Sequence, residues 1–116
     1  MIRLAIADDA PFIREIVRTI AEKNGLVLVG EAADGNEAIE LALRERPEFF
    51  LMDIIMPNKS GIEAAREILA QIPTMKIVAF STADQDVMVS RALEAGCCSF
   101  LVKPFKADDL LKVLQG

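Results

Sequence analysis

The sequence of 116 residues contains no histidine. This absence excludes metal sites built on imidazole, and it excludes Ser-His and Cys-His nucleophile pairs. It also means that the chain has no phosphohistidine of its own. Any metal or phosphoryl chemistry must therefore depend on other side chains.

Cysteine is scarce, and the only two, Cys97 and Cys98, are adjacent. Neighbouring Cα atoms lie about 3.8 Å apart, which is shorter than the usual separation across a disulfide. We therefore expect no bond between them. We interpret both as small buried side chains in a reducing compartment.

Long apolar runs are also missing. No stretch approaches the roughly 20 residues that span a bilayer, and the first residues lack the basic region of a secretory signal. The net charge of −5, with acids and bases mixed along the chain, argues against binding DNA or RNA by phosphate neutralisation. We expect a soluble, cytoplasmic protein that does not contact nucleic acid or membrane directly.

Apolar residues, by contrast, are abundant, at 53% of the chain against 27% charged residues. This composition is the opposite of a disordered one. The length matches the commonest size of one compact domain, and no low-complexity stretch or long linker interrupts the sequence. We expect one domain over residues 1–116.

Short β-rich runs alternate with segments of helical period. In the first helical segment Pro11 suits the first turn, and Gly25 follows the end. Ser60 and Glu63 form a capping box ahead of the third helical segment, and Gly96 ends the fourth. The expected strands are residues 2–7, 26–32, 49–53, 76–81 and 99–102.

This alternation predicts the α/β class. Strands separated by helices of this length form a parallel sheet with right-handed crossovers and helices on both faces. We predict a flavodoxin-like (βα)5 three-layer sandwich with strand order 2-1-3-4-5. In such a sheet ligands bind beyond the carboxyl ends of the strands, here between the first and third strands.

Polar side chains stand at four of the expected strand ends. In chain order they are Asp8 and Asp9 after the first strand, Asp53 at the end of the third, Ser81 at the end of the fourth and Lys103 after the fifth. Each alone has an ordinary explanation, such as a helix cap, a turn residue or a solvated lysine. Together they bring carboxylates, a hydroxyl and an ammonium to the edge where this fold binds ligands.

These residue types indicate phosphoryl chemistry supported by a metal. Clustered carboxylates repel one another unless a cation intervenes, and hard oxygen ligands without histidine or thiolate select Mg²⁺ or Mn²⁺. Mg²⁺ usually takes one or two carboxylates, which leaves one acid to attack, and Asp53 on the central strand is best placed. Lys103 would neutralise charge on the phosphoryl group, and Ser81 would donate a hydrogen bond to it.

With these residues in place, the chain resembles the receiver domain of two-component response regulators, and among them the single-domain chemotaxis regulators of the CheY type. The resemblance covers essentially the whole chain. It implies a phosphorylation-activated switch that catalyses only its own phosphorylation and slow autodephosphorylation. It rests on the Asp8-Asp9 pair, the Asp53-Ile54-Ile55-Met56-Pro57 segment, Ser81 and the Lys103-Pro104-Phe105 segment.

The resemblance also implies how the metal is held. Asp9 and Asp53 would bind Mg²⁺ together with the backbone carbonyl of Ile55, and Asp8 would act directly or through water. The family further implies a cis peptide bond between Lys103 and Pro104.

Two further roles follow from the resemblance. Phe100 occupies the position of the switch aromatic, whose ring movement is coupled to Ser81, although a core phenylalanine is the alternative interpretation. Ile55 and Ala83 occupy positions that tune dephosphorylation in the family. Neither side chain can hydrogen-bond an attacking water, so we hypothesise a long-lived phosphoaspartate.

The implied partners are a sensor histidine kinase, which donates the phosphoryl group from its phosphohistidine, and a downstream target. That target would be the flagellar motor switch or another effector, and it would read the surface of the fourth helix, fifth strand and fifth helix. We expect the domain to be a monomer.

Other functions remain open on the sequence alone. A pseudo-receiver would keep the fold and act as an interaction module without phosphorylation. An aspartyl-phosphate phosphatase of the haloacid-dehalogenase type needs a second acid two residues after the nucleophile, where Ile55 stands. A flavodoxin-like electron carrier is disfavoured by the acidic Asp8-Asp9 turn and by the absence of Trp and Tyr.

Overall fold

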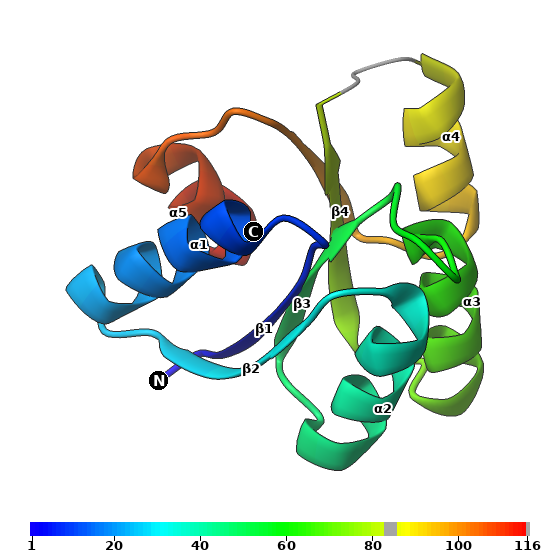
Figure 1. Ribbon diagram of the computed structural model, residues 1–116, viewed down its shortest axis with the longest axis horizontal. Coiled ribbons are helices and arrows are strands. Elements are labelled where there is room, and N and C mark those ends of the chain that lie inside the picture. The colour runs from blue at the N-terminus through cyan, green and yellow to red at the C-terminus, as the bar shows by residue number, and fades with distance from the viewer. Residues whose placement is uncertain (83–85, 116) are drawn as a thin grey trace.

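The computed structural model describes residues 1–82 and 86–115, and in them five strands alternate with five helices (Figure 1). The predicted strands are confirmed, with the first two beginning one residue later than expected. In chain order the elements are β1 (Arg3–Ala7), α1 (Pro11–Lys23), β2 (Val27–Ala32), α2 (Gly35–Glu45), β3 (Phe49–Asp53), α3 (Gly61–Gln71), β4 (Lys76–Ser81), α4 (Asp86–Glu94), β5 (Ser99–Val102) and α5 (Ala107–Gln115).

The sheet is parallel, and its order β2-β1-β3-β4-β5 confirms the predicted topology. Helices α1 and α5 cover one face of the sheet, while α2, α3 and α4 cover the other (Figure 1). The chain therefore winds in opposite directions from β1 and β3, and the carboxyl ends of these two central strands lie side by side.

Each face of the sheet has its own apolar core. In β1 the side chains of Leu4 and Ile6 pack toward α1 and α5, whereas Ala5 and Ala7 pack toward the other three helices. All four are completely buried. Strands buried on both faces read as continuous apolar runs, which is why β1 and β3 show little polar alternation in the sequence.

The local signals for helix ends also hold. Pro11 is the first residue of α1, and Ser60 is the N-cap of α3, where its Oγ accepts a hydrogen bond from the Glu63 N–H at 3.2 Å. Gly25 and Gly96 adopt φ angles of +69° and +105° just beyond α1 and α4. Glycine reaches this region without a steric penalty, so both helices end there.

The prediction for the cysteines is half wrong. Both thiols are free and Cys97 is buried, but Cys98 is exposed. Neighbouring side chains in an extended segment point in opposite directions, so two adjacent cysteines leading into β5 cannot both face the core. Burial raises the pKa of the Cys97 thiol to about 11.

Among the described residues, no helix has the length and apolarity needed to cross a membrane.

Candidate functional site

The ends of β1 and β3 bring the three predicted acids together. One carboxylate oxygen from each of Asp8, Asp9 and Asp53 lies within 4.8 Å of the others. Asp8 is 0% exposed and Asp53 is 4% exposed, while Asp9 is exposed to solvent. The cluster is therefore partly buried, and it is open to solvent at Asp9.

The side chain of Lys103 reaches this cluster from the loop after β5. Its Nζ lies 2.6 Å from Asp8 Oδ2 and 3.4 Å from Asp53 Oδ2, and the side chain is only 10% exposed. The interpretation of Lys103 as a solvated surface residue is therefore wrong. The peptide bond between Lys103 and Pro104 is cis.

Phe80 supports the ammonium, a role that the sequence did not reveal. The Lys103 Nζ lies 4.8 Å from the centroid of the Phe80 ring, and the Phe80 and Phe105 rings form a T-shaped pair with centroids 6.0 Å apart. A cation over an aromatic face is attracted to it. Phe80 reads as an ordinary strand residue in the sequence, and only the fold places it beneath the lysine.

The β1–α1 turn fixes Asp8 firmly. Asp8 Oδ1 accepts a hydrogen bond from the Ala10 N–H at 2.8 Å, and its main-chain oxygen accepts one from Arg14 Nη1 at 2.6 Å. The N-cap of α1 is Ala10, which makes no side-chain cap. Asp9 is therefore not a helix cap, and its carboxylate belongs to the acidic cluster. No sequence pattern indicates this role of Arg14, because the contact depends on the path of the turn.

The β3–α3 loop is joined to the start of α2. Asp34 caps α2 by accepting the Glu37 N–H at 2.8 Å, and its second oxygen accepts Asn58 Nδ2 at 2.7 Å. The Gly35 N–H also donates to the Lys59 carbonyl at 3.1 Å. These contacts between segments far apart in the chain fix the loop that follows Asp53.

Gly61 lies against the backbone of Asp53 itself. Its N–H donates to the Ile54 carbonyl at 2.9 Å, and a Cβ built at this position would lie 1.9 Å from the Asp53 carbonyl oxygen. No side chain fits there. The absence of a Cβ lets α3 begin directly against the end of β3.

Asp53 carries an unfavourable charge in this setting. Burial raises the pKa of its carboxyl to about 6; the nearby Lys103 ammonium lowers it, and the Asp8 carboxylate raises it again. The cluster holds three carboxylates against one ammonium. An all-oxygen donor set with surplus negative charge fits a hard divalent cation such as Mg²⁺.

The remaining predicted residues lie in several elements of the fold. Ser81 is buried at the end of β4, and Ile55, in the β3–α3 loop, is 62% exposed. Phe100 is partly buried and packs against the core beneath α2, α3 and α4, so it is neither a fully buried core residue nor a free surface ring. Ala83 lies outside the described residues.

Known proteins are similar to this chain in sequence and in structure. The chain is 40% identical over 115 residues to protein CcdB of Bacillus subtilis, covering 99% of this chain and 96% of the relative. It is 39% identical over 113 residues to the chemotaxis protein CheY of Thermotoga maritima, covering 97% and 94%. A LuxR-family two-component response regulator from Aurantimonas superposes with a TM-score of 0.93 at 30% identity, covering 99% of this chain and 83% of that one.

The family comparison covers nearly the whole chain. Residues 4–115 match the response regulator receiver domain. This match agrees with the acidic cluster at the carboxyl ends of β1 and β3, with the buried lysine and with the CheY relatives. The chain belongs to the receiver domain family of two-component response regulators, signalling domains whose general mode of action is switching by phosphorylation.

Proposed function

We propose that this domain accepts a phosphoryl group on Asp53 from the phosphohistidine of a sensor kinase. The observation that supports this most is the position of Asp53. It is a buried acid at the end of the central strand, and it shares Lys103 with Asp8. The contacts that its carboxylate makes with the Ile55 N–H and with Lys103 are long, at 3.3 Å and 3.4 Å. A carboxylate placed in this way can act as a nucleophile without losing a strong hydrogen bond.

The proposed ligands of Mg²⁺, or of Mn²⁺ in its place, are the carboxylates of Asp8, Asp9 and Asp53 and the backbone carbonyl of Ile55. When bound, the cation supplies positive charge for the phosphoryl oxygens. The residues of this chain do the rest. Asp8 keeps Lys103 in the site through the contact of 2.6 Å, and the hydrogen bonds at the β3–α3 loop fix the backbone at Ile55.

In the transfer step an oxygen of Asp53 forms a bond to phosphorus while the bond from phosphorus to the donor imidazole nitrogen breaks. The imidazole leaves with that electron pair and takes up a proton. Most of the catalysis comes from positioning and from charge on the phosphoryl oxygens. The Lys103 ammonium, already 3.4 Å from Asp53 Oδ2, provides part of that charge.

Phosphorylation then changes partner binding. A phosphoryl group on Asp53 gives the Ser81 hydroxyl and the Lys103 ammonium an additional acceptor, and this favours one of two conformations of the domain. Phe100 lies on the same face of the sheet as α4. We propose that its ring follows Ser81 and alters the surface of α4, β5 and α5, as the switch aromatic of a receiver.

The proposed pathway is a chemotaxis-like two-component system in the cytoplasm. The CheY proteins of Thermotoga maritima and Listeria monocytogenes, at 39% and 36% identity over nearly their full lengths, support this assignment. The output target would be the flagellar motor switch or another effector, contacted by a monomer.

Intact-mass measurement after incubation with acetyl phosphate tests the proposal. The wild type should gain the mass of one phosphoryl group with Mg²⁺ and not after chelation, and Asp53→Asn should gain none. Asp108→Asn, which changes an exposed acid in α5, should behave like the wild type. An unchanged mass in the wild type would indicate a pseudo-receiver that works without phosphorylation.

A further inference from the structure

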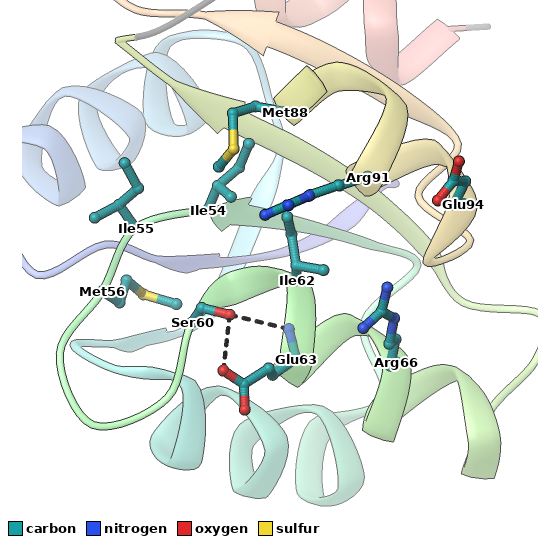
Figure 2. Close-up of a pocket in the computed structure, with 10 residues that line it drawn as sticks. All are labelled: Ile54, Ile55, Met56, Ser60, Ile62, Glu63, Arg66, Met88, Arg91 and Glu94. Atoms are coloured by element: carbon teal, nitrogen blue, oxygen red, sulfur yellow. Dashed lines mark hydrogen bonds between the residues drawn. The ribbon is translucent and has the colours of Figure 1, made fainter. Parts of the chain in front are cut away.

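Two loops carry the residues proposed to hold Mg²⁺, and the helices that follow these loops begin differently. At the start of α3 the Ser60 Oγ accepts the Glu63 N–H at 3.2 Å and donates to Glu63 Oε1 at 3.3 Å (Figure 2). At the start of α1 the N-cap residue is Ala10, whose side chain makes no cap. The turn that bears Asp8 and Asp9 is therefore held by other contacts.

Arg14, in the first turn of α1, reaches back to this turn. Its Nη1 donates to the main-chain oxygen of Asp8 at 2.6 Å. The Asp8 N–H donates to the Ala32 carbonyl at 3.0 Å, so both main-chain polar groups of Asp8 are bonded. Hydrogen bonds from a charged donor are shorter and stronger than those between neutral groups. Arg14 therefore fixes the chain where it leaves β1, immediately before Asp9.

Glu31 of β2 holds the Arg14 side chain in turn. Arg14 Nε lies 3.3 Å from Glu31 Oε1, and the two side chains are 20% and 25% exposed. Arg18, one turn further along α1, donates from Nη2 to both oxygens of the same carboxylate, at 2.9 Å and 2.8 Å. One guanidinium thus bonds to two partners through separate nitrogens, which fixes the plane of the group.

We propose that Arg14 is a positioning residue for the Mg²⁺ site. It acts through the main chain of Asp8 and not by contact with the cation. The contact keeps the Asp8 and Asp9 carboxylates where their oxygens lie within 4.8 Å of that of Asp53. A ligand set that is already arranged loses less freedom on binding, so it binds more tightly. The inference rests on the proposed metal site, and it makes Mg²⁺ affinity depend on Arg14 and Glu31.

The charge of Arg14 provides a sign that separates positioning from simple electrostatics. A cationic side chain near the carboxylates repels Mg²⁺, so loss of that charge alone should strengthen Mg²⁺ binding. The Glu31 carboxylate offsets this repulsion, because it is paired with the same guanidinium. Outer contacts that orient metal ligands commonly change metal affinity by about tenfold or more. Loss of Arg14 should therefore weaken Mg²⁺ binding.

An NMR titration with Mg²⁺, without phosphorylation, measures this affinity, and the amide spectrum shows that each variant is folded. Arg14→Met should bind Mg²⁺ about tenfold more weakly than the wild type. Arg14→Lys keeps the charge, but its single nitrogen cannot replace both Nε and Nη1, so it should bind about threefold more weakly. The matched control is Arg44→Met, which removes an exposed arginine of α2 and should bind as the wild type does.

Glu31→Gln tests the second contact. It should weaken Mg²⁺ binding by about threefold in the wild type, because Arg14 is then held less firmly. In the Arg14→Met background the same change should have no effect, since its influence passes through the arginine. Equal effects in both backgrounds would show that Glu31 acts by its charge alone and would overturn its role in holding Arg14.

Unchanged or tighter Mg²⁺ binding by folded Arg14→Met would overturn the positioning role and leave the proposed phosphorylation of Asp53 intact. Full affinity in Arg14→Lys would also overturn it, because charge without the two bonds would then be sufficient. A wild type that binds no Mg²⁺ would overturn the proposed metal site and this inference together.

Discussion

Asp8 and Asp53 are both buried acids at the ends of central strands, yet the protein holds them very differently. Asp8 accepts two short contacts, at 2.8 Å from the Ala10 N–H and at 2.6 Å from Lys103. The corresponding contacts of Asp53 are long, at 3.3 Å from the Ile55 N–H and 3.4 Å from Lys103. A carboxylate held by short charge-assisted bonds is fixed, whereas one with long bonds can react.

The pKa of Asp53, which burial raises to about 6, fits the same distinction. Its ionised form is poorly stabilised by the side chains around it, and a further cation would stabilise it. The division of labour within the cluster thus follows from hydrogen-bond geometry. In the proposed mechanism Asp8 positions the lysine, and Asp53 is the residue that reacts.

The largest effect is expected where the backbone of Asp53 contacts α3. Gly61→Ala should lower the free energy of unfolding by about 3 kcal/mol, since its Cβ would overlap the Asp53 carbonyl and force the loop to move. Gly25→Ala is the matched control, because that position has a positive φ but open space, and it should cost about 1 kcal/mol. Urea unfolding measures both, and equal losses would contradict the steric argument.

Replacing the two acids by their amides should change stability in opposite directions. Asp8→Asn breaks a nearly buried ion pair with Lys103, so it should lower the free energy of unfolding by about 3 kcal/mol. Asp53→Asn removes a poorly stabilised buried charge and should raise it by about 2 kcal/mol at pH 7 without divalent cations. Denaturation in EDTA measures both, and two losses of similar size would refute the distinction between these acids.

The stability contribution of Asp53 should depend on pH with a definite sign. Its pKa of about 6 in the folded protein exceeds the ordinary value of 3.8, so the folded state binds the proton more tightly. Stability from this group is therefore full below about pH 4 and is lost as the pH rises through 6. The difference between wild type and Asp53→Asn should grow by about 2 kcal/mol over this window, and a constant difference would show that the carboxyl is not perturbed.

Loss of the phosphoryl group should respond to positions 55 and 83, which the family resemblance links to the rate of dephosphorylation. Ile55→Asn/Ala83→Glu gives an attacking water hydrogen-bond partners that the wild type lacks, so dephosphorylation in Mg²⁺ should become faster by about tenfold. The matched control is Ile55→Val/Ala83→Val, which adds no polar group. If the polar double variant is no faster than wild type, water orientation does not set the phosphoryl lifetime.

The smallest effect is expected at the contact between the β3–α3 loop and α2. Asn58 has a φ of +67°. Asn58→Gly removes the hydrogen bond to Asp34, and glycine adopts this positive φ without steric strain. Asp34→Ser removes the same bond and keeps a cap for α2. Both should weaken Mg²⁺ binding by about threefold, which corresponds to the loss of one modest hydrogen bond. The increase in melting temperature on adding Mg²⁺ measures this effect. An increase equal to that of the wild type would show that the loop contact does not affect Mg²⁺ binding.

The sequence was sufficient for the fold and for the cluster of acids with Lys103 beside it. Alternating periods gave the strand order, and polar residues at strand ends gave Asp8, Asp9, Asp53, Ser81 and Lys103, because parallel strands bring their carboxyl ends to one edge. These inferences need only the direction of each strand.

What depends on loop paths and side-chain distances could not be predicted. The support of Lys103 by Phe80, the bond from Arg14 to Asp8 and the pairing of Asp34 with Asn58 join residues with no common sequence pattern. The contact distances of the Asp8 and Asp53 carboxylates differ by less than one ångström. The spacing of residues in a sequence does not encode differences of this size.

Chemical trapping tests the central claim most directly. Borohydride reduces an aspartyl phosphate to homoserine, so treatment of the phosphorylated protein followed by peptide mass spectrometry locates the acceptor. Homoserine at position 53 alone, formed only when Mg²⁺ was present during phosphorylation, is the predicted result. Homoserine at position 8 or 9, or a stable phosphate on Ser81, would contradict the assignment of Asp53 as the phosphoacceptor.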